Sequence, residues 1–351
     1  YIIHSAALIL NTVCCILLMK AGASVQIVKL TTSLLFLVQP VILAAIAKRK
    51  YQIDRTVRFT GEPIKQKWNG LAQHIAIVVL GNTDTVVLTV LSTLENVSVY
   101  AVYHLVVNGL RQLVGSMTDG MQAMFGNMLA KNETEELKQS FSYFEWGLHT
   151  LVTLVFSIAA VLIVPFVRVY TADISDANYI VPAFAYLITF AQAAYCLRLP
   201  YIIMVLAAGH YRQTQWSAII EAAINIVVSV VLVFNFGLIG VAIGTLAAMA
   251  YRTSYLAWYL SRNIVCRSLR HFLKHLLTDA VCVALLLGIV KLFSTFFTMQ
   301  QISYTAWLVL AVKVGFAAVL SVAAVNTLLY RREVLTAVKK VGAKRFIGRK
   351  M

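Results

Sequence analysis

The sequence predicts an all-α membrane protein with about ten transmembrane helices, and three observations lead to this prediction. Of the 351 residues, 60% are apolar and 13% are charged, whereas soluble domains are about 45–50% apolar and about 25% charged. The apolar residues form runs long enough to cross a bilayer as helices, which takes about 20 residues. Lys and Arg collect in the segments between these runs. The same composition excludes a soluble enzyme and a disordered chain.

Ten apolar runs are expected to be spanning helices, because none shows the alternation of transmembrane β-strands. They cover residues 2–19, 26–47, 71–93, 97–122, 142–168, 179–208, 214–235, 238–260, 273–292 and 304–328. The segment 131–140 after the fourth run is interpreted as either a short surface helix or a plain connector. Pro200 should kink the sixth helix, because proline lacks the N–H that a helix interior uses.

The basic residues predict which helix ends are cytoplasmic, because cytoplasmic loops carry an excess of Lys and Arg. With segment 48–70 placed inside, the inside loops and tail hold 22 of the 30 Lys and Arg, and the opposite side holds four. This predicts a multi-pass protein with both ends in the cytoplasm. The net charge of +16 could attract either nucleic acid or membrane lipid. Because the basic segments lie beside the spans, membrane lipid is the favoured partner.

Motifs for catalysis or metal binding are missing from the sequence. The five cysteines are scattered and have no CxxC pairs, so neither a disulfide framework nor a zinc site is expected. No nucleophile motif, phosphate-binding loop or metal-ligand set is found, so we expect no enzyme activity, cofactor or metal. A membrane-bound transferase would need such groups in a large loop, and the longest loop, 48–70, has Asp54 and Glu62 as its acidic residues.

Two helical hairpins of similar pattern indicate an internal repeat. One starts at Asn11 and turns at Gly22, and the other starts at Asn225 and turns at Gly237. Four spans separate segment 48–70 from the second hairpin. If the two halves are equivalent, four more helices should precede the first hairpin. We therefore expect the sequence to be a fragment that lacks its first four helices. In the second hairpin, Gly240 and Gly244 predict a small-xxx-small packing seam.

Several stretches resemble the polysaccharide-transporter branch of the multidrug/oligosaccharidyl-lipid/polysaccharide exporter superfamily. They are NTDTVVLTVLSTLENVSVYAVYHLVVNGLRQLV (82–114), FGNMLAKNE (125–133), RLPYIIMVLAAGHYRQTQ (198–215) and FNFGLIGVAIGTLAAMAYRTSYLAWYLSRN (234–263). The resemblance implies two six-helix lobes around a central cavity, often followed by two extra helices. It also implies a flippase that moves lipid-linked oligosaccharides across the bacterial cytoplasmic membrane by alternating access.

The resemblance also divides the chain into parts and suggests partners. The expected parts are the last two helices of an N-terminal lobe (1–47), a cytoplasmic linker (48–70), a six-helix C-terminal lobe (71–262), two additional helices (263–330) and a basic cytoplasmic tail (331–351). The expected partners are a lipid-linked diphosphate oligosaccharide, membrane lipid and polysaccharide synthesis enzymes. Two alternatives stay open: a drug/cation antiporter of the same superfamily, and a non-transporting membrane component of a polysaccharide synthesis complex.

Charged residues inside spans are the candidate substrate-binding residues, because a charge at bilayer depth costs at least about 2.5–3.5 kcal/mol and so faces a cavity or a partner. Guanidinium groups pair well with phosphate oxygens, so Arg111, Arg198 and Arg252 are proposed to bind the diphosphate. Polar neighbours at helical spacing complete the candidate set: Asn108 and Gln112 beside Arg111, and Glu221 and Asn225 on the seventh span.

Other polar residues in the spans leave alternatives open. Glu221 and Arg252 should lie at one depth of their hairpin, either as part of a cavity wall or as a structural ion pair. Asp84 is a weak candidate for cation coupling, and could instead hydrogen-bond its neighbours or be solvated. His74, His104 and His149 have no carboxylate or cysteine at ligand spacing. This favours interhelical hydrogen bonds over metal binding or proton transfer.

Overall fold

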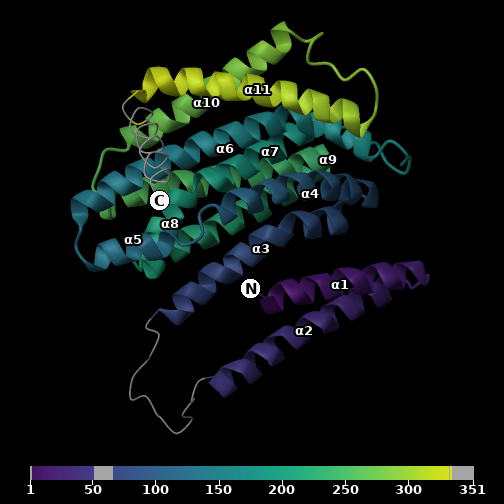
Figure 1. Ribbon diagram of the computed structural model, residues 1–351, viewed down its shortest axis with the longest axis horizontal. Helices are drawn as coiled ribbons and strands as arrows, with labels where there is room; N and C mark the ends of the chain where they lie inside the picture. Colours follow the sequence, from purple (N-terminus) through teal and green to yellow (C-terminus); the bar gives the residue numbers. More distant parts are fainter. Residues whose placement is uncertain (1, 51–65, 332, 334–351) are drawn as a thin grey trace, which may run out of the picture. The chain divides into compact units, whose positions relative to one another are not determined.

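The structure is a computed structural model that describes residues 2–50, 66–331 and 333 (Figure 1). Most of the predicted linker 48–70 and of the basic tail 331–351 lies outside the described residues. The chain divides into two units, residues 1–65 and 66–351. Every regular element in the described ranges is a helix. The prediction of an all-α protein is therefore confirmed.

The first unit is a helical hairpin of α1 (Ile2–Lys20) and α2 (Val25–Lys50). Gly22 in the turn has a φ of 74°, a left-handed conformation that glycine adopts without steric cost. His4 Nδ1 lies 3.4 Å from Gln39 Oε1, so the two helices run antiparallel. The hairpin predicted from the sequence is present.

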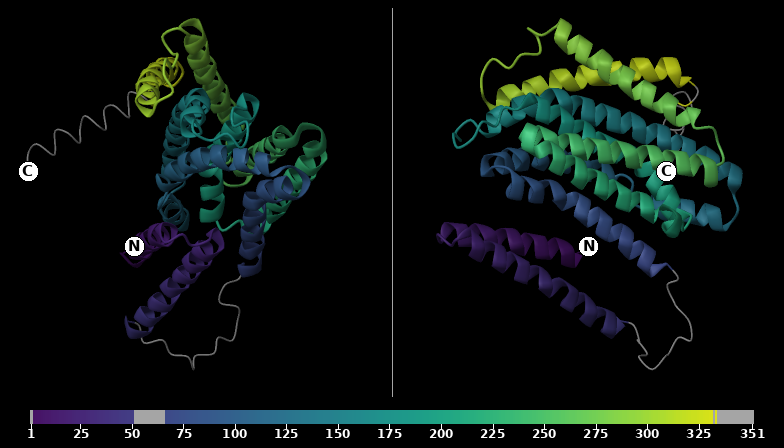
Figure 2. Two further views of the ribbon diagram at one scale, coloured as in Figure 1. Left: turned by 90° about the vertical axis from the view of Figure 1, so that its right-hand side faces the viewer. Right: turned by 180° about the vertical axis from the view of Figure 1, so that it is seen from behind.

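The second unit contains nine helical elements in its described part. They are α3 (Lys67–Leu91), α4 (Leu94–Ser116), α5 (Met121–Ala130), α6 (Thr134–Tyr170), α7 (Pro182–Leu197), α8 (Leu199–Ala207), α9 (Tyr211–Asn263), α10 (Arg270–Leu292) and α11 (Tyr304–Leu329). Helices α3 and α7 pack against α9, whereas α10 and α11 pack against each other and against α6 (Figures 1 and 2).

Helix α9 folds back on itself at Gly237, where the backbone leaves the helical conformation with a φ of 51°. Asn225 before the turn donates a hydrogen bond of 3.1 Å to Thr245 after it. A Cβ on Gly240 would collide with Leu232, and one on Gly244 would lie 2.8 Å from the backbone nitrogen of Ser229. The predicted glycine seam therefore holds the two limbs of α9 in close contact, and the predicted turn at Gly237 is confirmed.

Two helix boundaries differ from the sequence prediction. The fourth run ends at Ser116 rather than 122, because Gly120 takes a φ of 85° and α5 starts after it. The surface-helix interpretation of 131–140 is wrong, since residues from Thr134 onward are the first turns of α6. Leu137 and Phe141 in these turns are buried, which anchors the start of α6 in the core. The predicted kink at Pro200 is confirmed, because the helix is interrupted at Arg198, where α7 ends and α8 follows.

Eight described helical segments are long and apolar enough to cross a membrane. Large apolar side chains also cover their outer faces, among them Val90, Phe234, Val312 and Leu328. Such faces are stable against lipid and unfavourable in water. The protein is therefore a helical multi-pass membrane protein. The count of ten spans stays a prediction, because it adds α4 and takes the two limbs of α9 separately.

Candidate functional site

Two of the three predicted arginines lie against one tyrosine, Tyr195 near the end of α7. The guanidinium carbon of Arg111 on α4 lies 4.7 Å from the centre of the Tyr195 ring. That of Arg198, at the break between α7 and α8, lies 4.1 Å from the same ring. Guanidinium groups are attracted to aromatic faces at these distances. We call Arg111, Tyr195, Arg198, Glu221 and Arg252 the arginine cluster.

Glu221 is the carboxylate of the arginine cluster and neutralises part of its charge. Arg198 donates a hydrogen bond to Glu221 Oε1, and Arg252 Nε lies 3.8 Å from Oε2. Arg252 also donates to Ser217 and, over 2.9 Å, to the carbonyl of Thr214. The pairing of Glu221 with Arg252 expected from the hairpin is confirmed. Arg198 and Arg252 are both buried.

The other candidates on α4 are more accessible than the buried arginines. Arg111 and Asn108 are half-buried and Gln112 is exposed. The Oδ1 atom of Asn108 is buried and accepts no hydrogen bond. The structure therefore brings Arg111 into the arginine cluster through Tyr195, and leaves Asn108 and Gln112 beside it on the same helix.

Asp84 and Asn225 form a separate polar site between α3, α4 and α9. The Asp84 carboxylate accepts hydrogen bonds from Tyr100 (3.2 Å), Asn225 (3.1 Å) and Thr245 (2.7 Å). All three donors are neutral, and Asp84 is only 4% exposed. Asn225 Oδ1 is also buried, without a hydrogen-bond partner. Asn225 thus lies with Asp84 and not with the diphosphate candidates.

The oxygens around Asp84 are the ones best suited to hold a cation. A carboxylate, an amide oxygen and a hydroxyl are ligands that hard cations prefer, and the orphaned Asn225 Oδ1 is a free acceptor for one. Over the ranges that the structure describes, no three His, Cys, Asp or Glu side chains gather as a metal site. The ligands available at Asp84 are oxygens, without the nitrogen or sulfur ligands that zinc and copper prefer.

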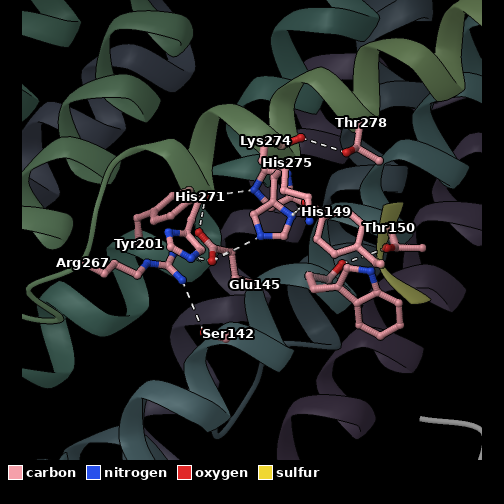
Figure 3. Close-up of polar contacts among 12 residues, drawn as sticks. Ser142, Glu145, His149, Thr150, Tyr201, Arg267, His271, Lys274, His275 and Thr278 are labelled. Carbon is pink, nitrogen blue, oxygen red and sulfur yellow. Dashed lines mark hydrogen bonds and ion pairs between the residues drawn. The ribbon is translucent and has the colours of Figure 1, made fainter. Parts of the chain in front are cut away.

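Sequence reasoning missed a second buried ionic group, which Figure 3 shows between α6, α8 and α10. Glu145 on α6 is fully buried and pairs with Arg267 from the loop before α10. Tyr201 on α8 donates to Glu145 over 2.8 Å, and His275 Nε2 lies 3.5 Å from it. The partners are 56 to 130 residues from Glu145 along the chain, so no local spacing points to them. The signal available was an acidic residue within an apolar run.

His149 and His275 extend this group from both sides. His149 Nδ1 lies 2.6 Å from Asp279 Oδ2, and its Nε2 lies 3.0 Å from the Tyr201 hydroxyl. The interhelical hydrogen bonding predicted for His149 is therefore confirmed. His275 Nδ1 lies 2.7 Å from the hydroxyl of Tyr330, just beyond the end of α11. Burial raises the pKa of Tyr330 to about 12, so Tyr330 keeps its proton at neutral pH.

Two cavities adjoin these residues. The first, of about 580 Å³, is lined by Arg267, Lys274, His275 and Tyr330 among others. The second, of about 420 Å³, is mostly apolar and is lined by Asp279 and by side chains of α6 and α7. The buried ionic group thus reaches one cavity at His275 and another at Asp279.

The fold and these sites define a class of protein but not a family. No protein-family model matches the chain, and no curated protein is significantly similar to it. The class is a helical multi-pass membrane protein whose buried charges lie between its helices rather than facing lipid.

Proposed function

We propose that the protein is a flippase that moves a lipid-linked diphosphate oligosaccharide or polysaccharide precursor across the bacterial cytoplasmic membrane by alternating access, with both ends in the cytoplasm. The observation that carries this proposal is the charge of the arginine cluster. Two guanidinium groups lie on the Tyr195 ring, a third lies 3.8 Å from Glu221, and Glu221 supplies the single carboxylate among the five residues of the cluster. The excess of two positive charges favours an anionic ligand.

Within the cluster, the arginines have different roles in the proposal. Glu221 holds Arg198 and Arg252 in place, so their charge is already ordered before a ligand arrives. Arg111 forms no ion pair with any described carboxylate and rests on the Tyr195 ring. A guanidinium group can form two parallel hydrogen bonds to phosphate oxygens. Arg111 is therefore the proposed direct contact for the diphosphate.

The test is saccharide export by a bacterial strain that lacks its own flippase and carries variants of this protein. Arg111→Ala should abolish export, and Arg111→Lys should restore it only in part, because lysine keeps the charge but loses the bidentate geometry. Lys313→Ala is the matched control, since Lys313 on α11 donates only to the carbonyl of Phe296 among the described residues. Normal export by Arg111→Ala at the wild-type protein level would overturn the proposal.

A second candidate function, cation-coupled transport, is favoured by the Asp84 site. A buried carboxylate with only neutral partners is costly unless it is protonated or binds a cation. We propose that Asp84, Asn225 and Thr245 bind a monovalent cation. Added sodium should raise the melting temperature of the wild-type protein by mass action and leave that of Asp84→Asn unchanged. The control is Asp173→Asn in the exposed loop after α6, and equal responses of all three proteins would refute cation binding at Asp84.

A further inference from the structure

A continuous chain of polar contacts joins α6, α8, α10 and the end of α11 in the second unit, and Figure 3 shows its middle part with His149, Tyr201, Glu145 and His275. It runs from Asp279 through His149, Tyr201 and Glu145 to His275 and then Tyr330. The rings of His149 and His275 are stacked with their centres 4.9 Å apart. Because each hydroxyl has one hydrogen and each carboxylate only accepts, the chain constrains where the protons lie.

The first constraint comes from Glu145. Its carboxylate is paired with the Arg267 guanidinium, and a carboxylate in such a pair is ionised. An ionised Glu145 has no hydrogen to give, so the Tyr201 hydroxyl is the donor in their 2.8 Å hydrogen bond. The only hydrogen of Tyr201 is thereby used.

The second constraint follows at His149. Since Tyr201 has no further hydrogen, the 3.0 Å contact to His149 Nε2 requires a proton on that nitrogen. His149 Nδ1 lies 2.6 Å from Asp279 Oδ2, while Thr153 donates to Asp279 Oδ1 over 2.7 Å. With Asp279 ionised, both of its oxygens are acceptors, Oδ1 from Thr153 and Oδ2 from His149, so Nδ1 also carries a proton. An imidazole with both nitrogens protonated is a cation.

The charges of the group agree with this assignment. Glu145 and Asp279 supply two negative charges, and Arg267 supplies one positive charge. One imidazolium makes the buried group neutral, whereas a second, stacked on the first at 4.9 Å, would leave an unpaired buried charge. His275 satisfies its contacts as a neutral ring, with Nδ1 accepting from Tyr330 and Nε2–H facing Glu145. The neutral group therefore holds one added proton, and this proton lies on His149.

We propose that His149 and Asp279 form a proton-binding site, which takes one proton from water onto His149 and links α10 to α6 through the resulting ion pair. The groups that face this site are Tyr201 from α8, Glu145 and Thr153 from α6, Arg267 from the loop before α10, and His275 from α10. Asp279 lines the apolar cavity of about 420 Å³, and the chain leads to His275 and Tyr330 in the cavity of about 580 Å³. The larger of the two cavities, which has a charged lining, is the place where the site can exchange its proton with water. The inference is independent of the saccharide transport proposed above.

The experiment is nitrogen NMR of the whole protein in lipid nanodiscs, with isotope-labelled histidine. The chain has seven histidines, and the spectrum of His149→Gln assigns the His149 signals. Near neutral pH, both His149 nitrogens should resonate as imidazolium and His275 should resonate as a neutral ring. A neutral His149 in the wild-type protein would overturn the proposal without any variant.

Three variants separate the site from its surroundings. Asp279→Asn removes the counter-charge and should shift His149 to the neutral imidazole range. His275→Gln removes the stacked ring and His271→Gln removes an exposed histidine of the same helix, and both should leave His149 as imidazolium. An imidazolium signal that persists in Asp279→Asn would show that Asp279 is not part of the site. If Asp279→Asn does not fold, the wild-type spectrum alone decides.

Discussion

Arg198 donates a hydrogen bond to Glu221, and in doing so joins the break between α7 and α8 to the first limb of α9. Arg198 follows directly on the last residue of α7 and precedes Pro200 by two positions. The break that proline imposes on the helix therefore lies where the guanidinium binds its carboxylate. This contact makes Glu221 the residue on which two buried arginines depend.

We expect Glu221→Gln to destabilise the protein strongly, because it leaves Arg198 and Arg252 buried without a negative charge. Breaking a buried ion pair at one partner costs about 3–5 kcal/mol. Double-variant cycles, measured as thermal unfolding in detergent, should give a larger coupling of Glu221 with Arg198 than with Arg252. The reason is that Arg198 donates a hydrogen bond to Glu221, whereas Arg252 Nε is 3.8 Å away. Equal couplings would contradict this ranking.

Patterns within one hairpin were enough to predict the structure of α9. The polar residues four apart and the turn glycine placed Glu221 opposite Arg252, because antiparallel helices bring residues equally far from a turn to one depth. The contact of Glu145 with Arg267 could not be predicted in this way, since it depends on how α10 packs against α6. A single sequence does not show how two helices that are distant in the chain align with each other.

The kink at Pro200 could be predicted from the sequence, whereas the helix boundary at Gly120 could not. Proline acts on its own backbone, so its effect could be predicted locally. Gly120 is one of 17 glycines, and nothing local in the sequence distinguishes it, with its left-handed φ, from Gly115, which stays helical. Among the site residues, Arg198 was predicted to lie inside a span and to bind the diphosphate, but its salt bridge to Glu221 was not predicted.

The glycine seam of α9 should tolerate no side chain. Gly244→Ala would push a methyl group into Ser229, and Gly240→Ala would push one into Leu232 on the opposite limb. Overpacking of this kind costs about 1–3 kcal/mol, so both variants should melt at lower temperature than the wild type. Gly288→Ala on α10 is the matched control, because no atom lies within 4 Å of its added Cβ. It should be neutral or slightly stabilising, since alanine favours helix.

The docking of α11 on α6 should depend on Asn326. Its Oδ1 accepts a hydrogen bond of 2.9 Å from the Trp146 indole N–H. The Thr150 hydroxyl lies 3.3 Å from the same oxygen and donates to the Trp146 carbonyl over 2.8 Å. Asn326→Ala leaves the Trp146 indole N–H without this acceptor, at a cost of about 1–3 kcal/mol for a buried group. Thr327→Ala on the next position is the control, because Thr327 is exposed and bonds only within its own helix in the described chain. The unfolding midpoints of the two variants should differ, and matching midpoints would show that Asn326 does not hold α11 in place.

The orientation of α6 gives a direct test of the topology predicted from the basic residues. Lys131 in the turn before α6 and Ser175 in the loop after it are both exposed, and the excess of Lys and Arg predicts that Lys131 lies on the cytoplasmic side. In a background without the five native cysteines, Ser175→Cys should react with a membrane-impermeant maleimide added to whole cells. Lys131→Cys should react only after the cells are opened. The 37 residues of α6 exceed the roughly 20 that a bilayer requires, so the two labels must come from opposite sides if α6 spans the membrane. Labelling of both cysteines in intact cells would show that α6 does not cross.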